Sequence, residues 1–110
     1  MAEQDTALAL GSGDVPVLGT PAVLALMERA ACAAVAPALG SADTSVGTWA
    51  DLNHVAASKV GAEVVAEAVL IAVNGRTLDF VCEAREGSTV VATAKHRRSV
   101  VDRERFLARD

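Results

Sequence analysis

Aromatic residues are the scarcest class in this sequence of 110 residues. Phe and Trp make up 3% of it, there is no Tyr, and the only members are Trp49, Phe80 and Phe106. Basic residues are also outnumbered, 10 against 14 acidic ones, which gives a formal net charge of −4. A broad nucleic-acid surface needs clustered positive charge and often aromatic side chains for stacking. The composition therefore argues against a nucleic-acid partner.

Cysteine is rare as well, and its spacing is uninformative for metal binding. Cys32 and Cys82 are the only two cysteines, and each lies inside an apolar segment. Neither belongs to the paired spacing that is typical of zinc or redox motifs. We therefore expect two buried free thiols in a reducing compartment.

The sequence also lacks an uninterrupted apolar run of membrane-spanning length. Its richest stretch, residues 15–39, contains Glu28, Arg29 and three prolines. The N-terminus has no basic start followed by a long apolar run, which a secretory signal would require. We expect a cytoplasmic protein that contacts no membrane.

Hydrophobic residues, by contrast, are abundant. They make up 52% of the chain, whereas charged residues make up 22%. A chain of this length is sufficient for one compact domain and too short for two, so we treat residues 1–110 as a single domain. One small domain does not easily hide so much apolar surface, and we therefore expect a homo-oligomer.

One helix is predicted near the N-terminus. Thr20 followed by Pro21 is typical of a helix N-cap with proline at the first helical position. The residues from Pro21 to about Val35 are rich in Ala, Leu and Met, and Pro37 and Gly40 then mark the stop. A helix that is apolar on nearly all sides belongs in the centre of a fold.

After this helix the pattern becomes extended. We predict four strands from their content of Val, Thr and other β-favouring residues, at 44–55, 62–73, 76–85 and 89–101. Asn74-Gly75 predicts a type I′ hairpin turn, and Gly87 marks a second turn. The sequence therefore predicts an α+β fold in which an antiparallel sheet wraps a central helix, the arrangement called the hot-dog fold.

Two ionisable residues fall on apolar faces. Glu28 shares a helical stripe with Leu24, Ala31 and Val35, so its carboxylate is either a buried polar group or one that reaches solvent from the helix edge. His54, near the end of the first predicted strand, is in phase with Leu52 on the core side. An imidazole there serves either as an acid or base or as a structural group.

Taken together, these residues match a known pattern. The run 19–28, which reads GTPAVLALME, followed by Gly47-Thr48 and His54, resembles the fluoroacetyl-CoA thioesterase-like family. In that family a Thr at the helix start, a Glu eight residues later and a His on the next strand form the catalytic set. The resemblance covers nearly the whole chain, and it implies that Thr20, Glu28 and His54 are catalytic.

The resemblance also implies an assembly and a substrate. We expect a homodimer, or a tetramer of such dimers, with two active sites at the subunit interface. Each site would hydrolyse an acyl-CoA thioester to the free acid and CoA without a metal or redox cofactor. His54 would activate water or the Thr20 hydroxyl, and Glu28 would either polarise the attacking group or carry the acyl group.

Three further residues receive roles on this basis. Backbone N–H groups near Gly47 and Thr48, or at the helix N-terminus, are suited to bind the oxyanion. Arg98 is our candidate for contact with CoA phosphates. The family's selectivity for fluoroacetyl groups is linked to phenylalanines near the acyl pocket. This chain has no aromatic residue before Trp49, so the sequence leaves the acyl group open.

Two other functions remain as alternatives. One is a non-catalytic hot-dog dimer that binds an acyl-CoA or another small ligand. The other is a hot-dog hydratase, which would rely on an Asp and a His close together. Asp51 and His54 are three positions apart and so face opposite sides of a strand, which disfavours the hydratase.

Overall fold

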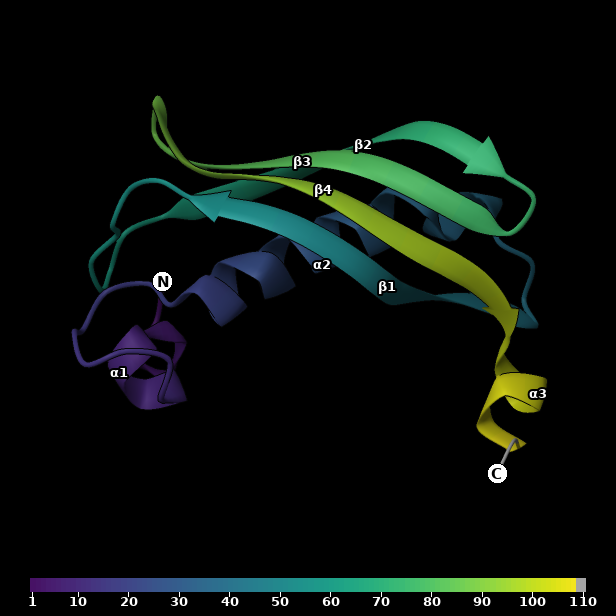
Figure 1. Cartoon of the computed structure of the whole chain (residues 1–110), viewed down its shortest axis with the longest axis horizontal. Coiled ribbons are helices and arrows are strands. Elements are labelled where there is room, and N and C mark those ends of the chain that lie inside the picture. The colour runs from purple at the N-terminus through teal and green to yellow at the C-terminus, as the bar shows by residue number, and fades with distance from the viewer. Residues whose placement is uncertain (109–110) are drawn as a thin grey trace.

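A curved sheet covers one long helix (Figure 1). The computed structural model describes residues 1–108. Its helix α2 (Thr20–Val35) lies against the concave face of the sheet. The strands are β1 (Asp43–His54), β2 (Val64–Asn74), β3 (Thr77–Glu86) and β4 (Thr89–Asp102), all antiparallel in the order β1-β4-β3-β2. The predicted helix and four strands are confirmed, with ends that differ by at most two residues.

The chain before α2 folds back over the start of that helix. This segment contains two short helices, η1 (Glu3–Asp5) and α1 (Ala7–Leu10). It is held by backbone hydrogen bonds from Gly19 N–H to the Asp5 carbonyl, 2.9 Å, and from Leu18 N–H to the Ser58 carbonyl, 2.8 Å. The N-terminal segment and the loop after β1 therefore meet at the N-terminal end of α2.

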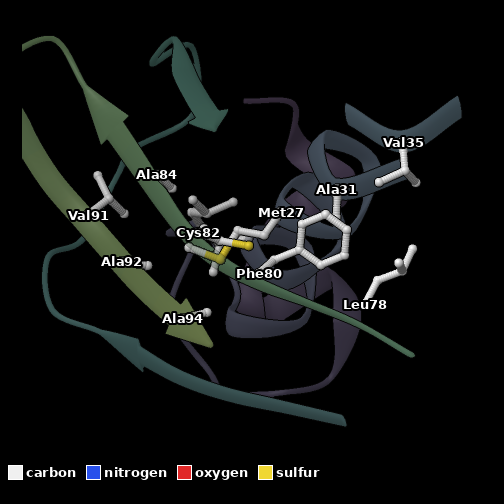
Figure 2. Packing of buried hydrophobic residues seen from close by; sticks show 12 residues of the cluster. Met27, Ala31, Val35, Leu78, Phe80, Cys82, Ala84, Val91, Ala92 and Ala94 are labelled. Carbon is white, nitrogen blue, oxygen red and sulfur yellow. The ribbon is translucent and has the colours of Figure 1, made fainter. Parts of the chain in front are cut away.

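The hydrophobic core lies between α2 and the sheet (Figure 2). The helix contributes Val23, Met27, Ala31 and Val35, which are spaced four residues apart and so form one stripe. The sheet contributes alternate residues of two strands, namely Leu78, Phe80, Cys82 and Ala84 of β3 and Ala92 and Ala94 of β4. This packing fixes the rotation of α2, and it places Glu28 immediately beside the buried stripe.

By length and hydropathy alone, the segment Thr20–Ala38, which includes the short helix η2 (Ala36–Ala38), would be able to span a membrane. It nevertheless contains Glu28 and Arg29, and its buried stripe packs on the sheet as that of a core helix does. The short helix α3 (Arg103–Ala108) follows β4.

The hairpin turns differ from the prediction in one detail. Asn74 pairs with Thr77, so Gly75 and Arg76 are the central residues of the β2–β3 turn. Gly75 has a φ of +61°, whereas no residue other than glycine has a positive φ in the part of the chain that the structure describes. A type I′ turn needs positive φ at both central positions, while a type II′ turn needs it only at the first. The type I′ prediction is therefore wrong, and the hairpin itself is confirmed.

A bulge in β1 changes which of its residues face the helix. The pairing with β4 shifts between Gly47 and Trp49, so that Gly47 lies opposite Arg98 and Ala50 opposite His96. Because one extra residue reverses the alternation, the concave face receives Ser45 and Gly47 before the bulge and Ala50, Leu52 and His54 after it. His54 and Leu52 share a face as predicted.

Candidate active site

Thr20 begins helix α2, but it does not cap that helix. Gly19 occupies the N-cap position and the cap has no side-chain hydrogen bond, so the prediction that Thr20 is the N-cap is wrong. Thr20 is instead the first helical residue, followed by Pro21. Its hydroxyl therefore makes no capping hydrogen bond to the backbone at the start of the helix.

The Thr20 hydroxyl instead meets His54. Its Oγ1 lies 3.0 Å from Nδ1 of the imidazole, a hydrogen-bonding distance between residues that are far apart in sequence. The other ring nitrogen, Nε2, is buried and has no partner within residues 1–108. A hydroxyl within hydrogen-bonding distance of a histidine nitrogen is the arrangement of a nucleophile and its general base.

A cavity opens beside this pair. Its volume is about 380 Å³, and both Thr20 and His54 line it. The remaining lining comes from small residues of the N-terminal segment and of the loop after β1, among them Ser12, Gly13, Val15, Val17, Ala56 and Ala57. None of the described residues that line it is Phe, Tyr or Trp. The Thr20–His54 pair therefore faces a space that is bounded mainly by small side chains.

Glu28 lies away from this pair in the same protomer. Eight residues of α-helix separate it from Thr20, a rise of about 12 Å. Its carboxylate Oε2 lies 3.2 Å from Nη1 of Arg98 and 3.9 Å from Nε2 of His96. The Glu28 side chain is 39% exposed. One protomer therefore unites Thr20 with His54, and it holds Glu28 in a separate polar cluster.

Arg98 belongs to that cluster rather than to the surface. Only 5% of the residue is exposed, and its guanidinium bonds to Ser45 and Glu28. The side chain points inward and each of its three nitrogens has a partner in the same protomer, so contact between Arg98 and CoA phosphates stays a prediction that this arrangement disfavours. Sequence reasoning missed this arrangement, although Arg98 alternates in phase with Ala94 and His96, which marks it as inward-facing.

The structure also separates Gly47 and Thr48 from the Thr20–His54 pair. Position 47 and His54 are seven residues apart on β1, about 20 Å of extended chain. Thr48 lies at the bulge, where its hydroxyl donates to the Arg97 carbonyl at 3.3 Å. Within one protomer these two residues do not reach the pair, so their oxyanion role stays a prediction that would require a second subunit.

Trp49 and Asp51 lie on the convex side of the sheet. Trp49 is opposite Arg97 in the strand register, and the Arg97 guanidinium lies 5.8 Å from the centre of the Trp49 ring. Asp51 lies on the same side as Trp49, whereas His54 lies on the concave side. The prediction that Asp51 and His54 face opposite sides is confirmed, which removes the residue pair on which a hydratase would rely.

A sheet that wraps one helix in this way is the hot-dog fold, and solved structures share it. A hot-dog-like protein from Thermanaerovibrio acidaminovorans matches with a TM-score of 0.87 at 21% identity, covering 97% of this chain and 79% of that one. A thioesterase superfamily member from Thermus thermophilus matches with a TM-score of 0.90 at 20% identity, covering 98% and 80%. The predicted fold class is confirmed.

More similar proteins identify the family. The family model described as fluoroacetyl-CoA-specific thioesterase matches residues 1–104. The fluoroacetyl-CoA thioesterase of Streptantibioticus cattleyicolor is 34% identical over 93 residues, which are 84% of this chain and 67% of that protein. A crystal structure of a point mutant of the fluoroacetyl-CoA-specific thioesterase FlK, in complex with fluoroacetate and CoA, has a TM-score of 0.91 at 29% identity and covers 96% of this chain and 90% of that one. The chain belongs to this family of acyl-CoA thioesterases.

Proposed function

We propose that this protein hydrolyses small acyl-CoA thioesters at a site that contains Thr20 and His54 of one protomer and Glu28 of the partner subunit. The contact of 3.0 Å between the Thr20 hydroxyl and His54 Nδ1, beside an open cavity, carries the proposal. Family membership supplies the thioester as the substrate class.

The Thr20–His54 pair is suited to the first chemical step. The Thr20 hydroxyl, or a water molecule bound to it, attacks the thioester carbonyl, and its proton passes to Nδ1 of His54. The tetrahedral intermediate then breaks its C–S bond, and the departing CoA thiolate takes a proton from His54. If Thr20 is the nucleophile, a water molecule releases the acyl group from its oxygen in a second, equivalent step.

The N-terminus of α2 offers a donor for the oxyanion. The N–H groups of Ala22 and Val23 both bond to the Gly19 carbonyl, at 3.0 and 3.1 Å, and Pro21 has no N–H. Thr20 N–H has no acceptor within residues 1–108, and the helix dipole adds partial positive charge at this end. An oxyanion that forms next to the Thr20 hydroxyl would therefore meet Thr20 N–H.

The distance between Glu28 and the pair is the reason to include a second subunit. A carboxylate about 12 Å further along the helix axis does not reach a carbonyl that is bound at Thr20. In a two-fold symmetric dimer, an element at the axis runs antiparallel to the same element of the partner subunit. One end of the element therefore lies next to the other end of its copy. Glu28 of the partner subunit would then complete the site, and each dimer would contain two sites.

Strand β1 is suited to that two-fold pairing. It is an edge strand of the sheet formed by the described residues, with β4 on its other side. If two copies of β1 pair antiparallel about an axis near Ala50 and Asp51, His54 of one lies opposite the bulge near Gly47 of the other. Glu28 lies directly over Gly47, so this pairing carries the carboxylate towards His54.

The lining of the cavity supports a small acyl group. Its Gly, Ala, Ser and Val side chains leave an open space rather than a long apolar tunnel. Free thiol release should be measured with acetyl-, fluoroacetyl-, butyryl- and long-chain acyl-CoA. We expect the highest kcat/KM among the short-chain substrates, and the comparison of acetyl- with fluoroacetyl-CoA settles the question of fluorine selectivity.

Site variants complete the test. His54→Gln and Glu28→Gln should each lower kcat by about 100-fold or more, with melting temperatures near that of the unmodified protein. Undiminished turnover in both variants would refute the site. Saturable acyl-CoA binding without thiol release from any substrate would refute hydrolysis, and it would identify a ligand-binding protein instead.

A further inference from the structure

A buried polar cluster surrounds the Glu28 carboxylate. It consists of Ser45 on β1 and of His96 and Arg98 on β4, and its two β4 residues are nearly inaccessible, with exposed fractions of 3% and 5%. His96 and Arg98 lie on the same face of β4 as Ala92 and Ala94, which precede them at alternate positions. This face is therefore apolar near the start of β4 and polar further along. Burying charge and polarity in this position is costly unless each group is paired.

Each of the three guanidinium nitrogens of Arg98 has a hydrogen-bond partner. Its Nε donates to the Ser45 hydroxyl at 2.9 Å, and its Nη2 donates to the Ser45 carbonyl at 3.0 Å. The third nitrogen, Nη1, donates to Oε2 of Glu28 at 3.2 Å. Because the planar guanidinium is fixed at two points by Ser45, the direction in which Nη1 meets Glu28 is also fixed.

His96 supports the same atom. Its Nδ1 lies 2.8 Å from the Trp49 carbonyl, which only accepts, so the proton of the ring is on Nδ1. Nε2 then has a lone pair, and it accepts from Nη1 of Arg98 at 3.2 Å. The ring is also stacked on Phe80, with 6.1 Å between the ring centres. His96 therefore holds Arg98 from the side opposite to Ser45.

Gly47 provides the space for the carboxylate. A Cβ atom at this position would lie 2.5 Å from Oε2 of Glu28 and 3.3 Å from the His96 ring. Such a separation is well inside van der Waals contact. The Glu28 carboxylate therefore lies against bare backbone of β1, where a side chain of any size would displace it.

We propose that Arg98 is a positioning residue for the catalytic Glu28, with His96 and Ser45 orienting its guanidinium. Within residues 1–108 the carboxylate is anchored through Oε2 alone, and the partly exposed side chain leaves Oε1 to face the substrate. A carboxylate on a rotatable side chain loses reactivity when it is free to turn away from the reacting atoms. The inference rests on the proposed function, because it assigns a role in thioester hydrolysis.

The first test compares two adjacent arginines. Arg98→Met removes the anchor, whereas Arg97→Met is a matched control, because Arg97 lies on the convex face and bonds to Asp79 at 2.7 Å. With acetyl-CoA as substrate, we expect Arg98→Met to lower kcat about 100-fold while KM changes little. Arg97→Met should keep the unmodified kcat and KM. Arg98→Lys retains the positive charge but not the planar guanidinium, so its kcat should lie between those of the two methionine variants.

A second comparison separates positioning from general structural support. Arg98→Met is introduced into a Glu28→Gln background, and residual thiol release is measured together with the melting temperature. If Arg98 acts through the carboxylate, it should cause little additional loss of kcat in that background. An equal loss in both backgrounds, or an unchanged kcat in Arg98→Met alone, would overturn the proposal. If Arg98→Met does not fold, Arg98→Lys is carried through the same cycle.

The two hypotheses fail in different ways. If the unmodified protein releases no thiol, the proposed function fails before Arg98 is considered. If the unmodified protein is active and Glu28→Gln is fully active as well, hydrolysis stands, but Glu28 has no part in it and the positioning role of Arg98 fails. If the unmodified protein is active and Glu28→Gln is not, the two comparisons at Arg98 test the positioning role alone.

Discussion

The hydroxyl oxygen of Thr20 lies 3.0 Å from Nδ1 of His54, which joins the first turn of α2 to the end of β1. Gly19, not Thr20, is the N-cap of the helix, so this contact is the main polar interaction of the hydroxyl. If Thr20 capped the helix, its hydroxyl would bond to the backbone of the first turn. The hydroxyl bonds to His54 instead, which favours a role in the reaction.

The first prediction concerns this hydroxyl. Thr20→Val keeps the shape of the side chain and removes its oxygen. We expect kcat to fall by about 100-fold or more, with a melting temperature close to that of the unmodified protein, since no cap is lost. Thr20→Ser retains the oxygen and should keep most of the activity. A fully active Thr20→Val protein would show that the hydroxyl takes no part in the reaction.

The second prediction tests whether each site is shared between subunits. Thr20→Val and Glu28→Gln chains, each nearly inactive alone, are unfolded together and refolded as a mixture. If one subunit supplies Thr20 and the other Glu28, each mixed dimer has one intact site, so about a quarter of all sites should be active. Measured thiol release would remain at the level of the separate variants if both residues act within one protomer.

The third prediction concerns the space under Glu28. Gly47→Ala places a Cβ 2.5 Å from Oε2, so the carboxylate must leave its present position between Gly47 and Arg98. We expect a loss of kcat comparable with that of Arg98→Met, about 100-fold. Gly40→Ala is the matched control, because its Cβ would meet nothing closer than Asp43 Oδ2 at 4.0 Å. Similar kinetics for the two variants would contradict the role of Gly47.

The fourth prediction is a dependence of stability on pH. Burial raises the pKa of the Cys82 thiol above its ordinary value of 9.0. As pH rises through that ordinary value, the unfolded chain loses the thiol proton while the folded protein retains it, so the free energy of unfolding decreases. This contribution is fully present below the ordinary value and is lost above it.

Urea unfolding at about pH 7 and at about pH 10 measures the effect. Cys82→Ala should show a smaller decrease in the free energy of unfolding between these two conditions than the unmodified protein. Cys32→Ala leaves Cys82 in place and should show the full decrease. An identical decrease in both variants would mean that Cys82 does not contribute.

Local sequence determined the elements of this protein. The run of Ala, Leu and Met after Pro21, ended by Pro37, was sufficient to predict α2, because helix formation depends on neighbouring residues and on the chain ends. Alternating β-favouring residues, separated by Gly75 and Gly87, likewise predicted the strands and hairpins. The spacing of Thr20, Glu28 and His54 was sufficient to indicate the family.

Tertiary structure decided how those residues are used. The bulge between Gly47 and Trp49 depends on how β1 pairs with β4, so simple alternation along β1 does not reveal that Gly47 shares a face with His54. Arg98 looked like a phosphate ligand, and its burial against Glu28 depends on the packing of α2 on the sheet. Sequence specified which residues are present on each element, whereas the distances between elements, which decide chemistry, are set only when those elements pack.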